Sequence, residues 1–240
     1  MTGRLGDIWV YLSATPLLGL TITLVVYQLA YWVYRRAGFH PLLNPVALAV
    51  LALVVVLKAT GTDYATYFDG AQFVHFLLGP ATVALAVPLY AQLGKLKAQA
   101  LPLLGALLIG SLVAIGSAVG IAWALGASRT TLVSLAPKSV TTPIAMGIAE
   151  KLGGLPSLTA VLVVSTGIIG AVTAKYVLDA LRIRDWAVRG FATGLAAHGI
   201  GTARAFQVSE EAGAFAGLAM GLNGLATSAL FPVLVWFVAR

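Results

Sequence analysis

The chain has 240 residues, of which 60% are hydrophobic and only 10% are charged, and its mean hydropathy is +0.95. Soluble domains carry about 25% charged residues, so this composition excludes a water-soluble globular protein, and long unbroken apolar runs exclude a membrane barrel of short alternating segments. There is no cysteine, and the net charge of +7 is spread without a basic run, which excludes thiolate metal sites and argues against nucleic-acid binding. We expect an all-α, multi-pass protein of the cell inner (plasma) membrane, without a cofactor.

The first apolar segment indicates a helix that stays in the mature protein. The run from Trp9 to Tyr34 is longer than a signal-peptide core, lacks a small-residue cleavage site and is followed by Arg35-Arg36. Residues 1–40 are therefore predicted to form a signal-anchor helix, and residues 41–240 the main membrane domain.

Further along the chain, apolar segments of two kinds alternate. A span needs about 20 residues, and four segments reach this length; they are residues 10–34, 101–125, 156–181 and 212–239. Residues 44–60 form a shorter fifth segment that ends near Lys58. Three others are interrupted by Gly, Pro and polar residues; they are residues 70–94, 128–151 and 187–207. Non-helical backbone at membrane depth must be buried in protein or line a cavity, so we expect broken or re-entrant helices and about 7–8 membrane segments.

Proline landmarks indicate an internal repeat. Residues 70–125 are predicted to form the first copy and residues 128–181 the second, followed by the third broken segment and the last helix. The equivalent prolines are Pro80 and Pro137, Pro88 and Pro143, and Pro102 and Pro156. Paired, proline-interrupted segments in two halves point to a transporter binding site.

Basic loops predict the orientation. Arg35-Arg36, Lys95 with Lys97, and Arg182 with Arg184 are expected on the cytoplasmic side by the positive-inside rule. This assignment requires residues 128–151 to leave and return on one side of the membrane. If that segment crosses fully, Arg182 and Arg184 lie outside.

Lys138 is the first candidate for binding chemistry. It lies in the sequence from Leu135 to Pro143 (LAPKSVTTP), between apolar helices. An ionisable residue inside a membrane normally faces a partner or a wet cavity, and Pro137 and Pro143 free backbone groups beside it. A cation beside hydroxyls and backbone donors suits a carboxylate. The alternative is a lysine that extends to the membrane interface from a short amphipathic helix.

A second cluster runs from His198 to Arg204 (HGIGTAR). Gly199 and Gly201 permit unusual dihedral angles, Arg204 offers a fork of donors to a carboxylate, and His198 could couple a proton to the solute. The alternative is a packing loop with a satisfied core histidine and Arg204 paired with Glu210 or Glu211.

Several residues complete the predicted site. The substrate-binding candidates are Lys138, Ser139, Thr141, Thr142, His198, Thr202 and Arg204, supported by Pro137, Pro143, Thr82, Gly199, Gly201 and Asn223. Thr82 is the counterpart of Ser139 in the first repeat copy, which has no counterpart of the Lys138 charge. Gly213, Gly217 and Gly221 are spaced for close packing, and a homodimer is expected. No catalytic motif is present, so an enzyme is not expected.

The sequence also resembles the LrgB/CidB family. The strings that carry the resemblance are Leu135 to Met146 (LAPKSVTTPIAM), Gly153 to Ala160 (GGLPSLTA), Gly167 to Ala171 (GIIGA), Ala197 to Ala205 (AHGIGTARA), Gly79 to Tyr90 (GPATVALAVPLY) and Gly213 to Gly221 (GAFAGLAMG). The similarity covers roughly residues 40–240, whereas the first helix resembles the family in hydropathy only.

This resemblance implies two kinds of function. Bacterial members are described as antiholin-like or holin-like proteins that modulate murein hydrolases and autolysis together with a small LrgA/CidA-type membrane partner. A plant plastid relative translocates glycolate and glycerate, and some bacterial members are linked to pyruvate. We therefore expect transport of a small anionic monocarboxylate across the lipid bilayer, with antiholin-like regulation as the alternative.

Overall fold

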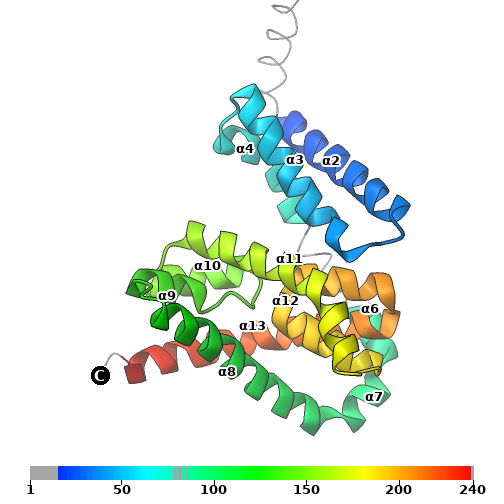
Figure 1. The fold of residues 1–240 in the computed structure, drawn as a ribbon, viewed down its shortest axis with the longest axis vertical. Helices are drawn as coiled ribbons and strands as arrows, with labels where there is room; N and C mark the ends of the chain where they lie inside the picture. Colours follow the sequence, from blue (N-terminus) through cyan, green and yellow to red (C-terminus); the bar gives the residue numbers. More distant parts are fainter. Residues whose placement is uncertain (1–15, 78–79, 81–82, 85, 239–240) are drawn as a thin grey trace, which may run out of the picture. The chain divides into compact units, whose positions relative to one another are not determined.

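The computed structural model describes residues 16–77, 80, 83–84 and 86–238, and every regular element in this part of the chain is a helix (Figure 1). Four of these helices are long and apolar enough to cross a membrane; they are Leu17–Arg36, Ala100–Ala124, Pro156–Ala180 and Glu210–Leu230. They correspond to the four long segments predicted from the sequence. A multi-pass helical membrane protein is the fold class that results.

The first of two compact units spans Met1–Ala84. It contains α2 (Pro16–Arg36), a short 3₁₀ helix (Pro41–Leu43), α3 (Pro45–Thr60) and α4 (Tyr64–Phe76). The side chain of Asn44 caps α3 by accepting hydrogen bonds from two backbone N–H groups, and Pro45 occupies the first turn, where a missing N–H costs nothing. This unit groups α3 and α4 with the first helix.

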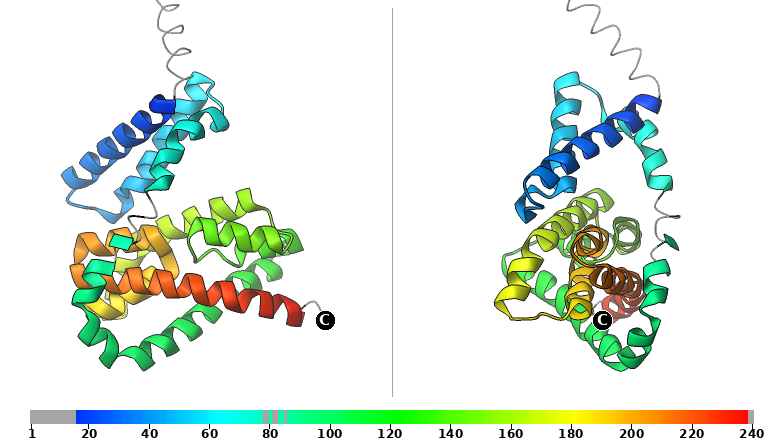
Figure 2. Two further views of the ribbon diagram at one scale, coloured as in Figure 1. Left: turned by 180° about the vertical axis from the view of Figure 1, so that it is seen from behind. Right: turned by 90° about the vertical axis from the view of Figure 1, so that its right-hand side faces the viewer.

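The second unit spans Leu85–Arg240 and carries the predicted site. After α6 (Ala86–Ala91) and α7 (Leu93–Ala98), its long helices are α8 (Ala100–Ala124), α11 (Pro156–Ala180) and α13 (Glu210–Val238). The interrupted elements between them are α9 (Arg129–Leu135), α10 (Thr142–Lys151) and α12 (Trp186–Val208). Figure 2 shows α11, α12 and α13 packed beside one another in this unit.

The first interrupted segment is a helical hairpin made of α9 and α10. The Leu155 N–H donates a 2.8 Å hydrogen bond to the Ser134 hydroxyl. A Cβ on Gly154 would lie 3.0 Å from that hydroxyl and 3.2 Å from the Ala149 Cβ. Ser134 near the end of α9 therefore lies beside the end of α10, so the chain reverses direction in the turn of residues 136–141. Both ends of this hairpin therefore lie on the same side of its tip, and the predicted membrane orientation stays a prediction.

The second hairpin is formed by α12 alone. His198 has φ 40° and ψ −133°, which interrupts the helix between residues 186–197 and 199–208. A Cβ on Gly201 would lie 2.8 Å from the Thr193 carbonyl oxygen, although positions eight apart in a continuous helix are separated by about 12 Å. The second arm therefore folds back along the first. The last arm is followed directly by α13.

An ion cluster joins the ends of three elements on the opposite side from the first hairpin's ends. The Lys95 ammonium lies 3.5 Å from the Asp185 carboxylate and also pairs with Glu211. Asp185 precedes α12 and Glu211 begins α13, so the second hairpin enters from the side where α7 lies. The first hairpin follows the far end of α8. The two hairpins therefore enter the unit from opposite sides.

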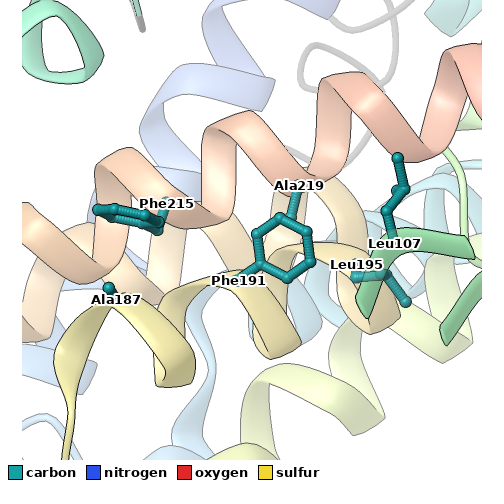
Figure 3. Close-up of a cluster of buried hydrophobic side chains, with 6 residues drawn as sticks. All are labelled: Leu107, Ala187, Phe191, Leu195, Phe215 and Ala219. Carbon is teal, nitrogen blue, oxygen red and sulfur yellow. The ribbon is translucent and has the colours of Figure 1, made fainter. Parts of the chain in front are cut away.

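A hydrophobic cluster holds the second hairpin between α8 and α13 (Figure 3). Its buried members are Leu107, Ala187, Phe191, Leu195, Phe215 and Ala219. Phe191 and Leu195 come from the first arm of α12, one helical turn apart, and face the same neighbours. Van der Waals contact of this kind is what drives helix association in a bilayer, where lipid is as apolar as the side chains.

The predicted repeat of residues 70–125 and 128–181 stays a prediction. Thr82 and four neighbouring positions between residues 78 and 85 lie outside the described residues. The equivalent helices α8 and α11 each have 25 residues. The structure also shows a second correspondence: the α9–α10 hairpin precedes α11 as the α12 hairpin precedes α13, with the opposite direction of approach.

Candidate functional site

The tip of the first hairpin is a compact, largely buried turn. Pro137 and Ser139 are buried, and the Val140 N–H donates to the Pro137 carbonyl at 3.2 Å. Thr141 caps α10 without a side-chain hydrogen bond, and Pro143 lies in the first turn. The N-terminus of α10, with its partial positive charge, therefore begins at this tip. Thr141 and Thr142 are half-buried beside it.

Lys138 adds a full positive charge to the same tip. Its side chain is half-buried, and its ammonium donates a 3.3 Å hydrogen bond to the Ser139 hydroxyl. Among the described residues, no carboxylate forms an ion pair with it. A cation that is partly withdrawn from solvent and lacks an acidic partner is suited to a mobile anion.

The tip of the second hairpin is strained at His198. The positive φ of this residue lies close to the first central position of a type II′ turn, which glycine normally occupies. Such a conformation costs a non-glycine residue about 1–3 kcal/mol. The ring is 4% exposed and donates from Nε2 to the Val163 carbonyl of α11 at 2.9 Å, a direction fixed by the acceptor. Gly167 leaves room for the ring, since a Cβ there would lie 2.6 Å from its Cε1 atom.

Asn223 on α13 connects the two tips. Its Nδ2 group donates to the carbonyls of Ser139 in the first tip and Leu195 in the second, each at 3.1 Å. Leu195 lies in the last turn before the break, where carbonyls lose their helical donors. The Asn223 amide oxygen accepts from Ser111 of α8 at 2.7 Å and from Thr227 at 3.3 Å. All three side chains are at most 2% exposed.

We call the group of Ser111, Lys138, Ser139, His198 and Asn223 the tip site. It lies at the middle of the long helices: Ser111 is the twelfth of 25 residues in α8, and Asn223 is the fourteenth of 29 in α13. The first arm of α12 has 12 residues and extends about 18 Å, compared with about 30 Å for the hydrocarbon core. This arm is therefore too short to cross a membrane alone.

Arg204 does not belong to this group, which corrects the expectation of one pocket shared by Lys138 and Arg204. Arg204 lies six residues beyond the break, about 9 Å along the returning arm. It lines a different cavity of about 690 Å³, together with Arg189 and Thr193, while Lys138 does not line that cavity. Its guanidinium donates a 3.5 Å hydrogen bond to the Gln207 side-chain oxygen.

The other predicted positions divide into two groups. Thr202 is buried and its hydroxyl donates to the His198 carbonyl at 2.8 Å, so it satisfies the broken backbone. Gly199 is half-buried and faces Met220, whereas Gly201 is buried against the first arm. Thr141 and Thr142, by contrast, make no side-chain hydrogen bond within the described part of the chain, which leaves their hydroxyls available at the first tip.

The glycine stripe on α13 is partly used inside the chain. Gly213 is buried and packs against the ring of Phe206 on the returning arm of α12. Gly221 has open space beside it. Gly213 therefore cannot take part in a dimer contact, whereas Gly221 remains open to one.

Sequence reasoning missed the role of Ser111 as the partner of Asn223. Asn223 was predicted only as a supporting residue, and Ser111 was not among the predicted site residues. The available signal was one polar residue at the middle of each of two long apolar helices, since an amide at membrane depth requires a partner.

Two broken hairpins that meet inside a bundle of membrane-crossing helices define a multi-pass membrane protein with a polar centre. A sequence model of the LrgB-like family matches residues 23–237, and the chain belongs to this family. The match begins inside α2, so it includes most of the first helix as well as the region that carries the motifs.

Named relatives agree with this assignment. The chain is 36% identical over 215 residues to the "Uncharacterized protein YxaC" of Bacillus subtilis (strain 168), covering 90% of this chain and 93% of that protein. It is 29% identical over 226 residues to the "Antiholin-like protein LrgB" of Bacillus mycoides (strain KBAB4), covering 94% of this chain and 98% of that protein. The LrgB of Bacillus cereus (strain B4264) matches to the same extent. No solved structure matches the chain.

Proposed function

We propose that this protein transports small monocarboxylates of the glycolate, glycerate, lactate and pyruvate class by alternating access. The observation that carries the proposal is the meeting of two opposed hairpin tips at mid-span beside Lys138, a cation without an acidic partner among the described residues. A bound carboxylate would neutralise this charge, and the substrate's hydroxyl or keto oxygen would bind at Ser139, Thr141 and Thr142.

The electrostatics of the first tip favour a singly charged anion. Lys138 supplies one full charge, and the N-terminus of α10 adds a partial one. A net charge inside a membrane carries a large desolvation cost. A substrate with one carboxylate, which neutralises the one Lys138 ammonium, therefore has a lower desolvation cost than a substrate with two. Many secondary transporters contain discontinuous membrane helices whose N-termini face the anionic group of the substrate.

The opposed hairpins supply the two gates that alternating access needs. Each hairpin reaches the centre from one side, so withdrawal of one tip would open the centre to that side alone. Asn223 holds both tips through single hydrogen bonds to backbone carbonyls, contacts that one tip could give up without disturbing the other.

The test is uptake of radiolabelled glycolate and pyruvate by proteoliposomes that contain the purified protein. Lys138→Gln is expected to abolish saturable uptake, because a neutral side chain cannot balance the carboxylate. Lys151→Gln is the matched control, since Lys151 is exposed at the end of the same hairpin. Equal uptake by wild type and Lys138→Gln, with both variants folded by thermal melting, would refute the tip site.

Antiholin-like regulation is the second candidate, and the names of the Bacillus relatives favour it. In this reading the protein controls murein hydrolase activity and autolysis through a small LrgA/CidA-type membrane partner, and solute movement is not required. Lysis rates of cells that express Lys138→Gln distinguish the two. Regulation through partner binding predicts normal lysis control by this variant, whereas control through carboxylate balance predicts its loss.

A homodimer is part of the same proposal. The exposed segment of α13 around Gly221, where an added Cβ meets nothing within 4 Å, is open to close approach by another helix. Cross-linking of Gly221→Cys in membranes tests this contact. The sequence contains no other cysteine, so any cross-linked dimer must pass through that position.

A further inference from the structure

A second group of cations surrounds the cavity that Arg204 lines, and we call this cavity the basic recess. Its volume is about 690 Å³, within the range of about 300–1,000 Å³ that is typical of small-molecule sites. The charged residues that line it are Lys175, Asp179, Arg182, Arg184, Arg189 and Arg204. Five cations thus surround one carboxylate. None of them belongs to the tip site.

The single acidic residue is already paired. Arg189 donates to the Asp179 carboxylate at 2.7 Å and to the Ile183 carbonyl at 2.8 Å, and its side chain is only 13% exposed. Within the described residues, Lys175, Arg182 and Arg184 form no ion pair. Lys175, Arg182 and Arg184 therefore give the recess a positive excess, because its one lining carboxylate, Asp179, is paired with Arg189.

The recess lies at the C-terminal end of α11, a helix long and apolar enough to cross a membrane. Lys175 is in the last turns of α11, Arg182 and Arg184 are in the connection to α12, and Arg204 is on the returning arm. Trp186, which lines it, is 40% exposed, as expected of an aromatic residue at headgroup depth. Basic pockets between membrane helices at this depth bind phosphate headgroups.

We propose that the basic recess binds a phosphate group, carried either by an anionic phospholipid headgroup or by a soluble phosphomonoester. A phosphate presents several acceptor oxygens to arginine forks, and a phosphomonoester carries a charge of about −1.5 to −2 at neutral pH. A monocarboxylate would neutralise only one of the cations. The bound group would connect α11, the following turn and the second hairpin, which are otherwise joined here by the Arg189–Asp179 pair.

The experiment measures lipid retention and soluble-ligand binding on the purified full-length chain. Native mass spectrometry would compare retention of cardiolipin, phosphatidylglycerol and phosphatidylcholine. Thermal melting would compare inorganic phosphate and glycerol phosphate with chloride at equal ionic strength. The recess variant combines Arg182→Gln, Arg184→Gln and Arg204→Gln. Its matched control combines Lys97→Gln, Arg129→Gln and Lys151→Gln, three exposed cations outside the recess.

Each outcome decides the proposal. Preferential retention of cardiolipin that weakens by about tenfold or more in the recess variant alone supports a headgroup ligand. Protection by inorganic phosphate that the same variant loses supports a soluble ligand. If the recess variant does not fold, the single substitution Lys175→Gln takes its place in both measurements. A competition experiment, in which phosphate displaces cardiolipin from the wild-type protein, then accompanies it. Equal behaviour of recess and control variants, or of anionic and zwitterionic lipids, overturns the proposal.

Discussion

The Ser111 hydroxyl on α8 donates a 2.7 Å hydrogen bond to the Asn223 amide oxygen on α13. This contact determines which way the amide faces, because the oxygen is held towards α8 and the Nδ2 group is left to face the two hairpin tips. The orientation of one side chain thus controls the donors available to two backbone carbonyls. A residue from a third element thereby takes part in joining the hairpins.

The first prediction concerns the amide of Asn223. Asn223→Asp keeps the shape but replaces the donor with an acceptor, so the carbonyls of Ser139 and Leu195 lose their partner. Each buried group left unsatisfied costs about 1–3 kcal/mol, and we expect a destabilisation of at least about 2 kcal/mol. Thermal unfolding in detergent measures it. Ser228→Ala is the control, since that hydroxyl bonds only within its own helix; equal melting of both variants would contradict the prediction.

The second prediction concerns the space beside His198. A Cβ at Gly167 would lie 2.9 Å from the His198 Nε2 atom and from the Ile200 Cδ1 atom, so Gly167→Ala must displace the ring. We expect overpacking to cost about 1–3 kcal/mol in unfolding free energy and transport to decrease.

Gly116→Ala is the matched control for that substitution. Gly116 is also within a long membrane helix, but nothing lies within 4 Å of the position of its Cβ. Alanine favours helix over glycine by about 1 kcal/mol, so this variant is expected to be neutral or more stable. Equal melting temperatures for the Gly167→Ala and Gly116→Ala proteins would contradict the prediction that an alanine at position 167 must displace the His198 ring.

The third prediction concerns helix approach at Gly190. Its missing side chain is replaced by the backbone of Ala212 on α13, which cannot rotate away as a side chain can. Gly190→Ala is therefore expected to destabilise the protein more than Gly167→Ala. Gly105→Ala, with open space at its Cβ, is the control. Melting temperatures of the three variants test the order, and a Gly190→Ala protein as stable as the Gly105→Ala protein would reverse it.

The fourth prediction is a pH dependence of the ion cluster. The Val188 N–H, followed by the Lys95 charge, holds the pKa of the Asp185 carboxyl below its ordinary value of about 3.9. Its contribution to stability is present above that value and is lost as the pH falls through the lower folded pKa. The hydrogen bond to Glu211, followed by the Asp185 charge, raises the pKa of Lys95 above about 10.4. That contribution is present below pH 10 and lost as the pH rises through the higher folded pKa.

Melting of wild type and Lys95→Gln across pH tests this dependence. The difference between them is expected to be constant between about pH 5 and 9 and to shrink towards both extremes. High salt should reduce it, because the cluster is partly exposed. Lys97→Gln is the control, since Lys97 is exposed and belongs to no ion pair within the described chain. A difference that grows in acid would contradict the assigned signs.

The interrupted segments could be predicted from the sequence because glycine, proline and an isolated charge are incompatible with an ordinary membrane helix. Predicted residues 128–151 and 187–207 correspond to the α9–α10 hairpin and α12. The break in α12 also falls within the predicted cluster. However, the unusual dihedral angles belong to His198 and not to Gly199 or Gly201, because the ring must reach the Val163 carbonyl while Gly201 makes room for the first arm.

The position of Arg204 could not be predicted, because proximity in sequence says little about depth once a hairpin reverses. Six residues along the returning arm carry Arg204 away from the tip and towards Arg182 and Arg184. Those two arginines were interpreted only as markers of membrane orientation. Their gathering with Lys175 around one cavity depends on the fold of α11 against both arms of α12, which no local pattern encodes.

The opposed approach of the hairpins has a practical consequence for labelling. Because the chain has no native cysteine, one thiol placed at Thr141 and another at Gly199 would report the two tips separately. A membrane-impermeant reagent added to one face of a vesicle should reach only the hairpin whose tip has withdrawn towards that face. Substrate that shifts the protein between its two orientations would then protect one thiol while it uncovers the other.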